Sequence, residues 1–160
     1  MPSWLIVILI CAVLFLLAVF IQAKSTSKLV ERGLIINREK DFMEKAEIFT
    51  LKPVSTDQVV AGLKDVNAKT KVGINGTMER GYLFDGGSYS RWKASLRCME
   101  KNESQSVFRF VFTEWETQND RPKDDISMNI LLTALEKMFL QLDPQTQVKS
   151  ESVEIHTKRK

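Results

Sequence analysis

The sequence has few of the residues that most often bind metals or carry catalysis. It contains one histidine and two cysteines among 160 residues. Cys11 lies in an apolar run near the N-terminus and Cys98 stands alone in the rest of the chain, so no disulfide framework is expected. The lone His156 has no second histidine, and no Cys-x-x-Cys motif accompanies it. The sequence therefore predicts no metal site and fits a reducing compartment.

Motifs for nucleotide binding or nucleophilic catalysis are also missing. Gly86-Gly87 is part of neither a GxGxxG motif nor a Gly-Lys-Ser/Thr motif, so it predicts a hairpin turn and no cofactor. Cys98 and His156 lack a third group to orient them, which makes them a weak catalytic pair. The acidic residues between 118 and 125 do not follow the EF-hand spacing and are better interpreted as a solvated loop with a helix cap. No catalytic or cofactor-binding residue is assigned.

The net charge of +3 gives no sign of a nucleic-acid partner. A nucleic-acid-binding domain usually gathers its Lys and Arg residues in one basic stripe. No such stripe with interleaved aromatic residues is visible here, so nucleic acid is not an expected partner.

One long apolar run is present at the N-terminus. The eighteen residues from Trp4 to Ile21 contain no charge, no proline and no glycine. As a helix they would span roughly 27 Å, close to the thickness of the bilayer hydrocarbon. A cleaved signal peptide would have a shorter apolar run and small residues before the cut. We predict an uncleaved transmembrane helix over residues 1–22, which contacts the lipid bilayer through residues 4–22.

Basic residues flank this run only on its C-terminal side, where five Lys and Arg lie within residues 24–40. The positive-inside rule then predicts that the C-terminal domain is cytoplasmic. N-glycosylation triplets begin at Asn75 and Asn102, and they would matter only for a lumenal domain in a eukaryote. We interpret both as hairpin turns.

Residues 23–46 are expected to form a juxtamembrane tether. The simplest interpretation is that the tether continues the helix, breaks near Gly33 and packs on the domain. The alternative is an interfacial segment that its Lys and Arg side chains hold on anionic lipid. The apolar positions do not repeat at helical spacing, which favours the simpler tether.

Residues 47–160 predict one α+β domain. Ser55 and Gln58 make a capping-box pattern at the start of a helix. Asn75-Gly76 is the strongest short hairpin signal in the chain. The predicted order is strand, helix, four-stranded meander, helix, strand (β-α-β-β-β-β-α-β), with segments at residues 47–51, 55–67, 71–74, 77–84, 88–99, 105–117, 125–142 and 148–155.

Alternation in the two longest strands predicts a sheet with one apolar face. We expect an antiparallel sheet with both helices packed on that face. This arrangement is similar to helix-grip and TATA-binding-protein-like folds, a likeness of fold that implies no function. The residues expected on the apolar face are Trp92, Ala94, Leu96, Cys98, Phe108, Phe110 and Phe112.

The opposite, outer face of the sheet is the one candidate binding surface. An ordinary solvated face is the simpler interpretation. Val107, Val111 and Trp115 are expected to add apolar area there, which a partner or a second copy would cover. Four basic residues on this face could contact an anionic surface such as lipid headgroups or an acidic partner: Arg91, Lys93, Arg97 and Arg109.

These features together predict a single-pass membrane-anchored protein with a small non-enzymatic binding or interaction domain. The partner would be a membrane-complex subunit, another copy of the chain, or an apolar ligand held between helix and sheet. One alternative is a membrane-anchored enzyme with a carboxylate-based site, using residues such as Glu114 and Glu116. Another alternative is a module that binds lipid surfaces.

Overall fold

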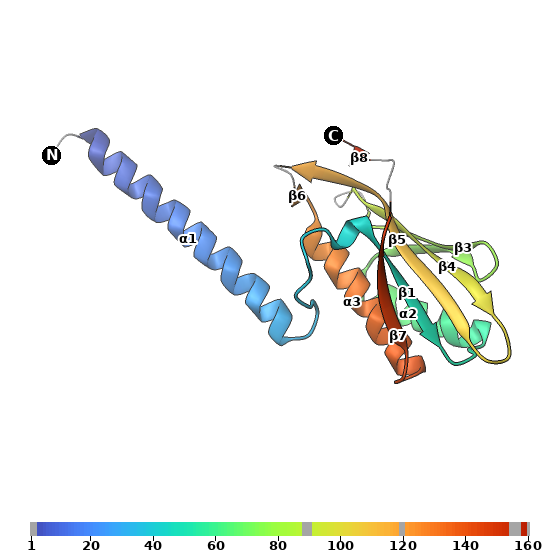
Figure 1. Cartoon of the computed structure of the whole chain (residues 1–160). Helices are drawn as coiled ribbons and strands as arrows, with labels where there is room; N and C mark the ends of the chain where they lie inside the picture. The colour runs from blue at the N-terminus through green and yellow to red at the C-terminus, as the bar shows by residue number, and fades with distance from the viewer. Residues whose placement is uncertain (1–2, 88–90, 119–120, 154–157, 160) are drawn as a thin grey trace. The chain divides into compact units, whose positions relative to one another are not determined.

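A computed structural model describes residues 3–87, 91–118, 121–153 and 158–159, and within the first helix it describes only part of the side chains. The chain divides into two units, Met1–Asn37 and Arg38–Lys160. The first unit contains α1 (Ser3–Glu31), a continuous helix that ends close to the predicted break at Gly33 (Figure 1). The predicted transmembrane span finds no support here: over the described residues, no helix is both long enough and apolar enough to cross a membrane.

The second unit is built on an antiparallel sheet, and the predicted α+β class is confirmed. Six strands follow one another across the sheet in the order β2-β3-β4-β5-β1-β7. Two short strands extend it, β6 antiparallel and β8 parallel to the far end of β5. The elements of this unit are η1 (Phe42–Glu44), β1 (Lys45–Leu51), α2 (Thr56–Thr70), β2 (Gly73–Thr77), β3 (Gly81–Asp85), β4 (Lys93–Lys101), β5 (Ser106–Gln118), β6 (Arg121–Pro122), α3 (Asp125–Leu142), β7 (Gln147–Ser152) and β8 (Lys158–Arg159).

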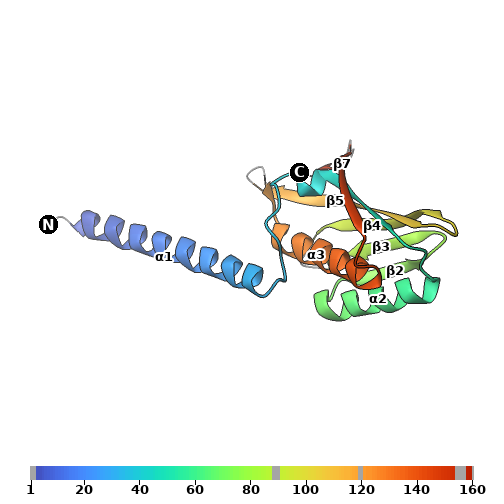
Figure 2. The same cartoon turned by 60° about the horizontal axis from the view of Figure 1, so that its bottom comes forward.

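The two helices of this unit, α2 and α3, lie side by side on one face of the sheet (Figure 2). Aromatic contacts join the layers: the ring of Phe139 on α3 stacks on Phe49 of β1, with ring centroids 4.5 Å apart. The predicted apolar face is confirmed over most of its length, because Phe108, Phe110 and Phe112 are each only 1% exposed. A core of this kind holds the helices by burying apolar area on both layers.

The predicted starts of the two helices can be compared directly. At α2 the capping box is confirmed: the backbone N–H of Gln58 donates to Ser55 Oγ, and the backbone N–H of Ser55 donates to Gln58 Oε1. At α3 the N-cap is Asp124, one residue before the predicted Asp125, and its side chain makes no capping hydrogen bond. The predicted helix segment 125–142 matches the bounds of α3, and only the identity of the capping residue differs from the prediction.

Trp115 does not lie on the outer face as predicted. It is 2% exposed and belongs to the hydrophobic core. The reason is a β-bulge: Ala94 pairs with Phe112, whereas its neighbour Lys93 pairs with Glu114. The extra residue on β5 reverses the alternation beyond it and turns Trp115 inward.

The predicted turn at Asn75-Gly76 is wrong. Both residues lie inside β2, and the turn follows at residues 78–80. Gly76 has a φ of 132°, and a Cβ atom there would collide with the backbone oxygen of Gly81. The glycine is needed for this close approach of β2 to β3, not for a turn.

The turn predicted at Asn102 is present. Its side-chain oxygen accepts hydrogen bonds from the backbone N–H groups of Ser104 and Gln105, each at 2.9 Å. At the C-terminus, the last two described residues form β8, which pairs with β5. Residues 88–90, Ile155 and His156, which belong to predicted strands or to the weak catalytic pair, lie outside the described residues.

Candidate functional site

The four predicted basic residues separate into two groups. Arg91 and Lys93 are neutralised: an Nη atom of Arg91 lies 2.8 Å from a carboxylate oxygen of Glu116, and Lys93 Nζ lies 3.1 Å from Glu114. The ion pair with Glu116 also raises the pKa of Arg91. Exposed pairs of this kind contribute little to stability, but they remove both cations from a binding surface.

Arg97 and Arg109 form the second group. They occupy opposite positions on β4 and β5, facing away from the helices. Within the described part of the chain, neither side chain makes a hydrogen bond or an ion pair. Two like charges directly opposite each other destabilise a sheet, so this register is unfavourable on its own.

The carboxylates of the alternative enzyme prediction are the partners of the first group. Glu114 and Glu116 border a cavity of about 320 Å³ that Trp92 and Trp115 also line. Both carboxylates are held by basic side chains, Glu116 by Lys123 as well at 3.8 Å. Carboxylates held in ion pairs of this kind are engaged in structural contacts, which does not favour a catalytic role.

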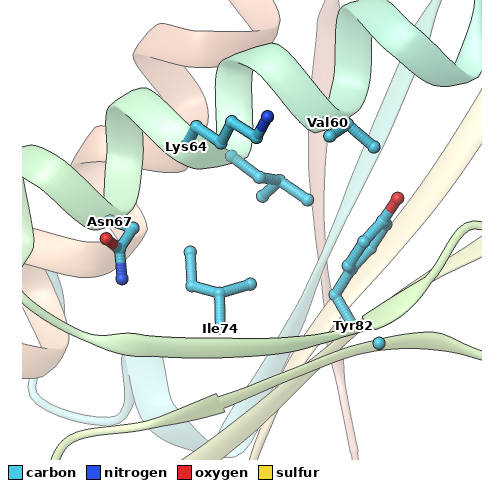
Figure 3. Close-up of a pocket in the computed structure, with 7 residues that line it drawn as sticks. Val60, Lys64, Asn67, Ile74 and Tyr82 are labelled. Atoms are coloured by element: carbon cyan, nitrogen blue, oxygen red, sulfur yellow. The ribbon is translucent and has the colours of Figure 1, made fainter.

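A second cavity lies on the other face of the sheet, between α2 and the hairpin of β2 and β3 (Figure 3). It has a volume of about 360 Å³ and is partly open. Its lining mixes apolar and polar side chains: Val60, Leu63, Lys64 and Asn67 from α2, and Ile74, Gly76 and Tyr82 from the strands. The side-chain amide of Asn67 donates to the backbone oxygen of Val72, which fixes the loop between α2 and β2.

Tyr82 is the unusual member of this lining. Its side chain extends from β3 with the hydroxyl toward Val60 on α2 (Figure 3). The residue is only 6% exposed, and the hydroxyl has no hydrogen-bond partner among the residues that the structure describes. Burial raises the pKa of Tyr82, which keeps the phenol protonated and able to donate. The indole of Trp92, by contrast, donates to Ser127 Oγ at 2.8 Å.

A third polar group, which we call the Arg38 cluster, is fully paired. Arg38 lies 2.8 Å from a carboxylate oxygen of Glu136 and donates to Asn129 Oδ1 at 3.0 Å and to Thr133 Oγ1 at 3.4 Å. All three partners come from successive turns of α3. The guanidinium is therefore tied to one side of that helix, and the Arg38 side chain is only 9% exposed.

Glu47 on β1 lies on the helix-covered face of the sheet, near Glu136 and Arg38. It is 5% exposed and accepts a hydrogen bond from Ser150 Oγ at 2.8 Å. Burial raises the pKa of Glu47, and the nearby Glu136 carboxylate adds to this rise, while Ser150 and Arg38 oppose it. The result is a buried carboxyl whose ionisation depends on its surroundings.

Sequence reasoning missed both Tyr82 and Arg38. Arg38 was counted only as a flanking charge, although polar residues at 129, 133 and 136 repeat at the i, i+4 and i+7 spacing of one α3 face. That spacing is a signal for a buried polar partner. No comparable signal marks Tyr82, because alternation places it inward without showing whether its hydroxyl is bonded.

No group of three or more His, Cys, Asp or Glu side chains suited to a metal ion occurs in the described part of the chain. Comparison with known protein families found no family model that matches this chain. A comparison with curated proteins found no match either.

Proposed function

We propose that this chain is a single-pass membrane-anchored protein whose domain binds a small amphipathic ligand in the cavity between α2 and the β2–β3 hairpin. The observation that carries the proposal is the buried hydroxyl of Tyr82, which lies beside the cavity and has no partner in the described residues. A buried hydroxyl without a hydrogen bond costs about 1–3 kcal/mol. A bound ligand that accepts this hydrogen bond would recover that cost.

The proposed anchor is supported by the sequence from Trp4 to Ile21 and by the continuity of α1 through it. Only a helix satisfies its own backbone groups over such a length in lipid. The basic residues that follow favour a cytoplasmic domain. Reporter fusions at the C-terminus, one active only in the cytoplasm and one only outside, test this part. A signal only from the outside reporter would reject the cytoplasmic orientation.

The proposed ligand follows from the lining of the cavity. A volume of about 360 Å³ lies within the usual range for small-molecule sites. Val60, Leu63 and Ile74 suit an apolar body. Tyr82 supplies a donor and Lys64 an exposed ammonium, so a carboxylate or carbonyl is the matching polar group. The hydroxyl itself is buried, so a neighbouring side chain has to move aside for an acceptor to reach it.

A binding role is preferred over an enzyme because the lining offers no nucleophile activated by a base. The carboxylate-based enzyme is the weaker proposal, since Glu114 and Glu116 are held in ion pairs. The likeness to helix-grip and TATA-binding-protein-like folds stays a prediction from the order of elements.

The test is calorimetric titration of the full chain in nanodiscs with octanoate, a short amphipathic carboxylate, after subtraction of empty nanodiscs. Ile74→Trp fills the cavity from β2 and should abolish binding. Leu83→Trp adds the same side chain on the outer face, where Leu83 is 62% exposed, and should leave binding unchanged. Equal heats for the wild type and Ile74→Trp would reject the cavity as a binding site.

A further inference from the structure

We propose further that Arg97 and Arg109 form an anion-binding pair on the outer face of the sheet, and that the anion is the phosphate group of anionic membrane lipids. The pair lies on the face opposite the ligand cavity and is independent of it. The choice of lipid as the bound anion rests on the proposed membrane anchor. Anion binding by the two arginines does not depend on that anchor.

The first support is the register of the sheet. Arg97 faces Arg109 across β4 and β5, with Gly81 beyond Arg97 on β3 and Ile48 beyond Arg109 on β1. Neither arginine has an acidic neighbour in this row. An anion bound between the two would turn their repulsion into attraction.

The second support is that the acids nearest to the pair are already engaged. Glu100 sits one row away, opposite Val107, and its carboxylate accepts hydrogen bonds from Asn102 and Gln105 in the turn. Three further acids of this face hold basic side chains: Glu114 holds Lys93, Glu116 holds Arg91, and Glu151 holds Lys149 at 3.0 Å. These pairs neutralise Lys93, Arg91 and Lys149, whereas no ion pair of Arg97 or Arg109 occurs among the described residues.

The third support is the placement of the Arg97 stem. A Cβ atom at Gly81 would stand 2.9 Å from Cγ of Arg97, so the stem lies over the glycine, which leaves room for it. Packing of the aliphatic stem on the sheet directs the guanidinium outward. The planar guanidinium forks of two such arginines match the oxygens of a phosphate group.

Membrane lipid is the occupant that the surrounding surface favours. Leu83 is 62% exposed, and Ile48, Val107 and Val111 are half-buried on the same face. Basic side chains beside aliphatic ones are typical of surfaces that sit at the lipid headgroups. A domain tethered to a bilayer also meets that bilayer at a high effective concentration.

The experiment measures docking of the full chain in nanodiscs. An environment-sensitive fluorophore is attached at Asn75→Cys, an exposed position of β2 on the outer face, after Cys11 and Cys98 are replaced by serine. Nanodiscs of phosphatidylcholine alone are compared with nanodiscs that also contain phosphatidylserine. We expect a blue shift only with the anionic lipid, and the shift should weaken as salt is added.

The variants separate the proposed pair from general basic charge. Arg97→Gln and Arg109→Gln should each lower the ratio of docked to undocked domain about fivefold. Arg91→Gln and Lys93→Gln remove the same charge from neutralised positions and should leave the ratio within about twofold. Arg97→Gln should also melt no lower than the wild type, because it relieves the repulsion.

Three results would overturn the proposal. One is an equal shift in neutral and anionic nanodiscs. Another is an equal loss in the Arg91→Gln and Arg97→Gln variants, which would show an effect of overall charge. The third is a shift produced by polyglutamate in neutral nanodiscs with none from anionic lipid, which would assign the pair to an acidic protein. Failure of the chain to enter nanodiscs would instead reject the anchor and, with it, lipid as the occupant.

Discussion

The Arg38 cluster and the Tyr82 hydroxyl are two polar sites beneath the same sheet, and they differ in whether the protein satisfies them. Arg38 meets three partners on α3, at 2.8 to 3.4 Å. The hydroxyl of Tyr82, beside α2, meets none in the described residues. Folding alone accounts for the first site, because buried charges are retained when they are paired. It does not account for the second site, whereas the proposed ligand would supply the missing hydrogen bond.

The largest effect is expected from Arg38→Met. The variant leaves Glu136, whose side chain is only 14% exposed, without its cation, and the loss of a largely buried partner costs about 3 kcal/mol. Chemical denaturation of the full chain, followed by tryptophan fluorescence, measures the change. Arg91→Met breaks an exposed pair and should cost under about 1 kcal/mol. Equal losses of unfolding free energy in Arg38→Met and Arg91→Met would show that the Arg38 cluster stabilises the domain no more than the exposed Arg91–Glu116 pair.

The next effect comes from the wall of the cavity. Gly76→Ala places a Cβ against the Gly81 backbone at a φ of 132°, so we expect a loss of about 2 kcal/mol. Octanoate binding should weaken as well, because the β2–β3 hairpin shapes the cavity. Asn75→Ala, at the exposed neighbouring position, should change stability by less than about 0.5 kcal/mol. A harmless Gly76→Ala would argue against the close approach of the two strands.

Tyr82→Phe tests most directly whether the unpaired hydroxyl serves binding and not folding. Removing an unpaired buried hydroxyl should leave the free energy of unfolding unchanged or raise it by up to about 1 kcal/mol. Octanoate binding should weaken about tenfold, the equivalent of one hydrogen bond of about 1.4 kcal/mol. The informative result is that octanoate binding weakens while the free energy of unfolding stays the same or rises. A loss of stability without a loss of octanoate binding would show that the Tyr82 hydroxyl stabilises the fold and does not bind the ligand.

The smallest effect is a pH dependence at Glu47. Burial raises the pKa of this carboxyl above its ordinary value of 4.5, so the folded state keeps a proton that the unfolded state has lost. Its contribution to stability is therefore fully present below pH 4.5 and is lost as the pH rises through the folded-state pKa. Glu47→Gln keeps the acceptor for Ser150 and removes this dependence. Unfolding free energies between pH 4 and 7 should show the two proteins diverging as the pH rises.

Much of the domain could be predicted because local signals agree with the tertiary structure. The Ser55 capping box and the alternating phenylalanines of β5 each depend on a few neighbouring residues, and both are confirmed. The position of Trp115 could not be predicted, since one extra residue in a β-bulge reverses every later side chain. The role of Gly76 could not be predicted either. It depends on the backbone of Gly81 in the neighbouring strand, and a rule for two-residue turns does not consider that contact.

The candidate site was harder to predict than the fold. Arg97 and Arg109 were expected on one face together with Arg91 and Lys93, but sequence could not show which of the four would find acids. That depends on the register of β4 against β5. The cavity and its unpaired hydroxyl depend on how α2 sits over β3, and no periodic pattern encodes that distance.

The position of β1 in the sheet also sets the order in which the domain can be completed. The strands from β2 to β5 pair with their neighbours in sequence, whereas β1 lies between β5 and β7, and its Glu47 bonds Ser150 at a separation of 103 residues. Contacts that distant close late and slowly. During synthesis the edge of β1 that pairs with β7 therefore stays unpaired until residues 147–152 have left the ribosome. We expect the meander to form the early folding nucleus and the pairing of β1 with β7 to limit the final rate.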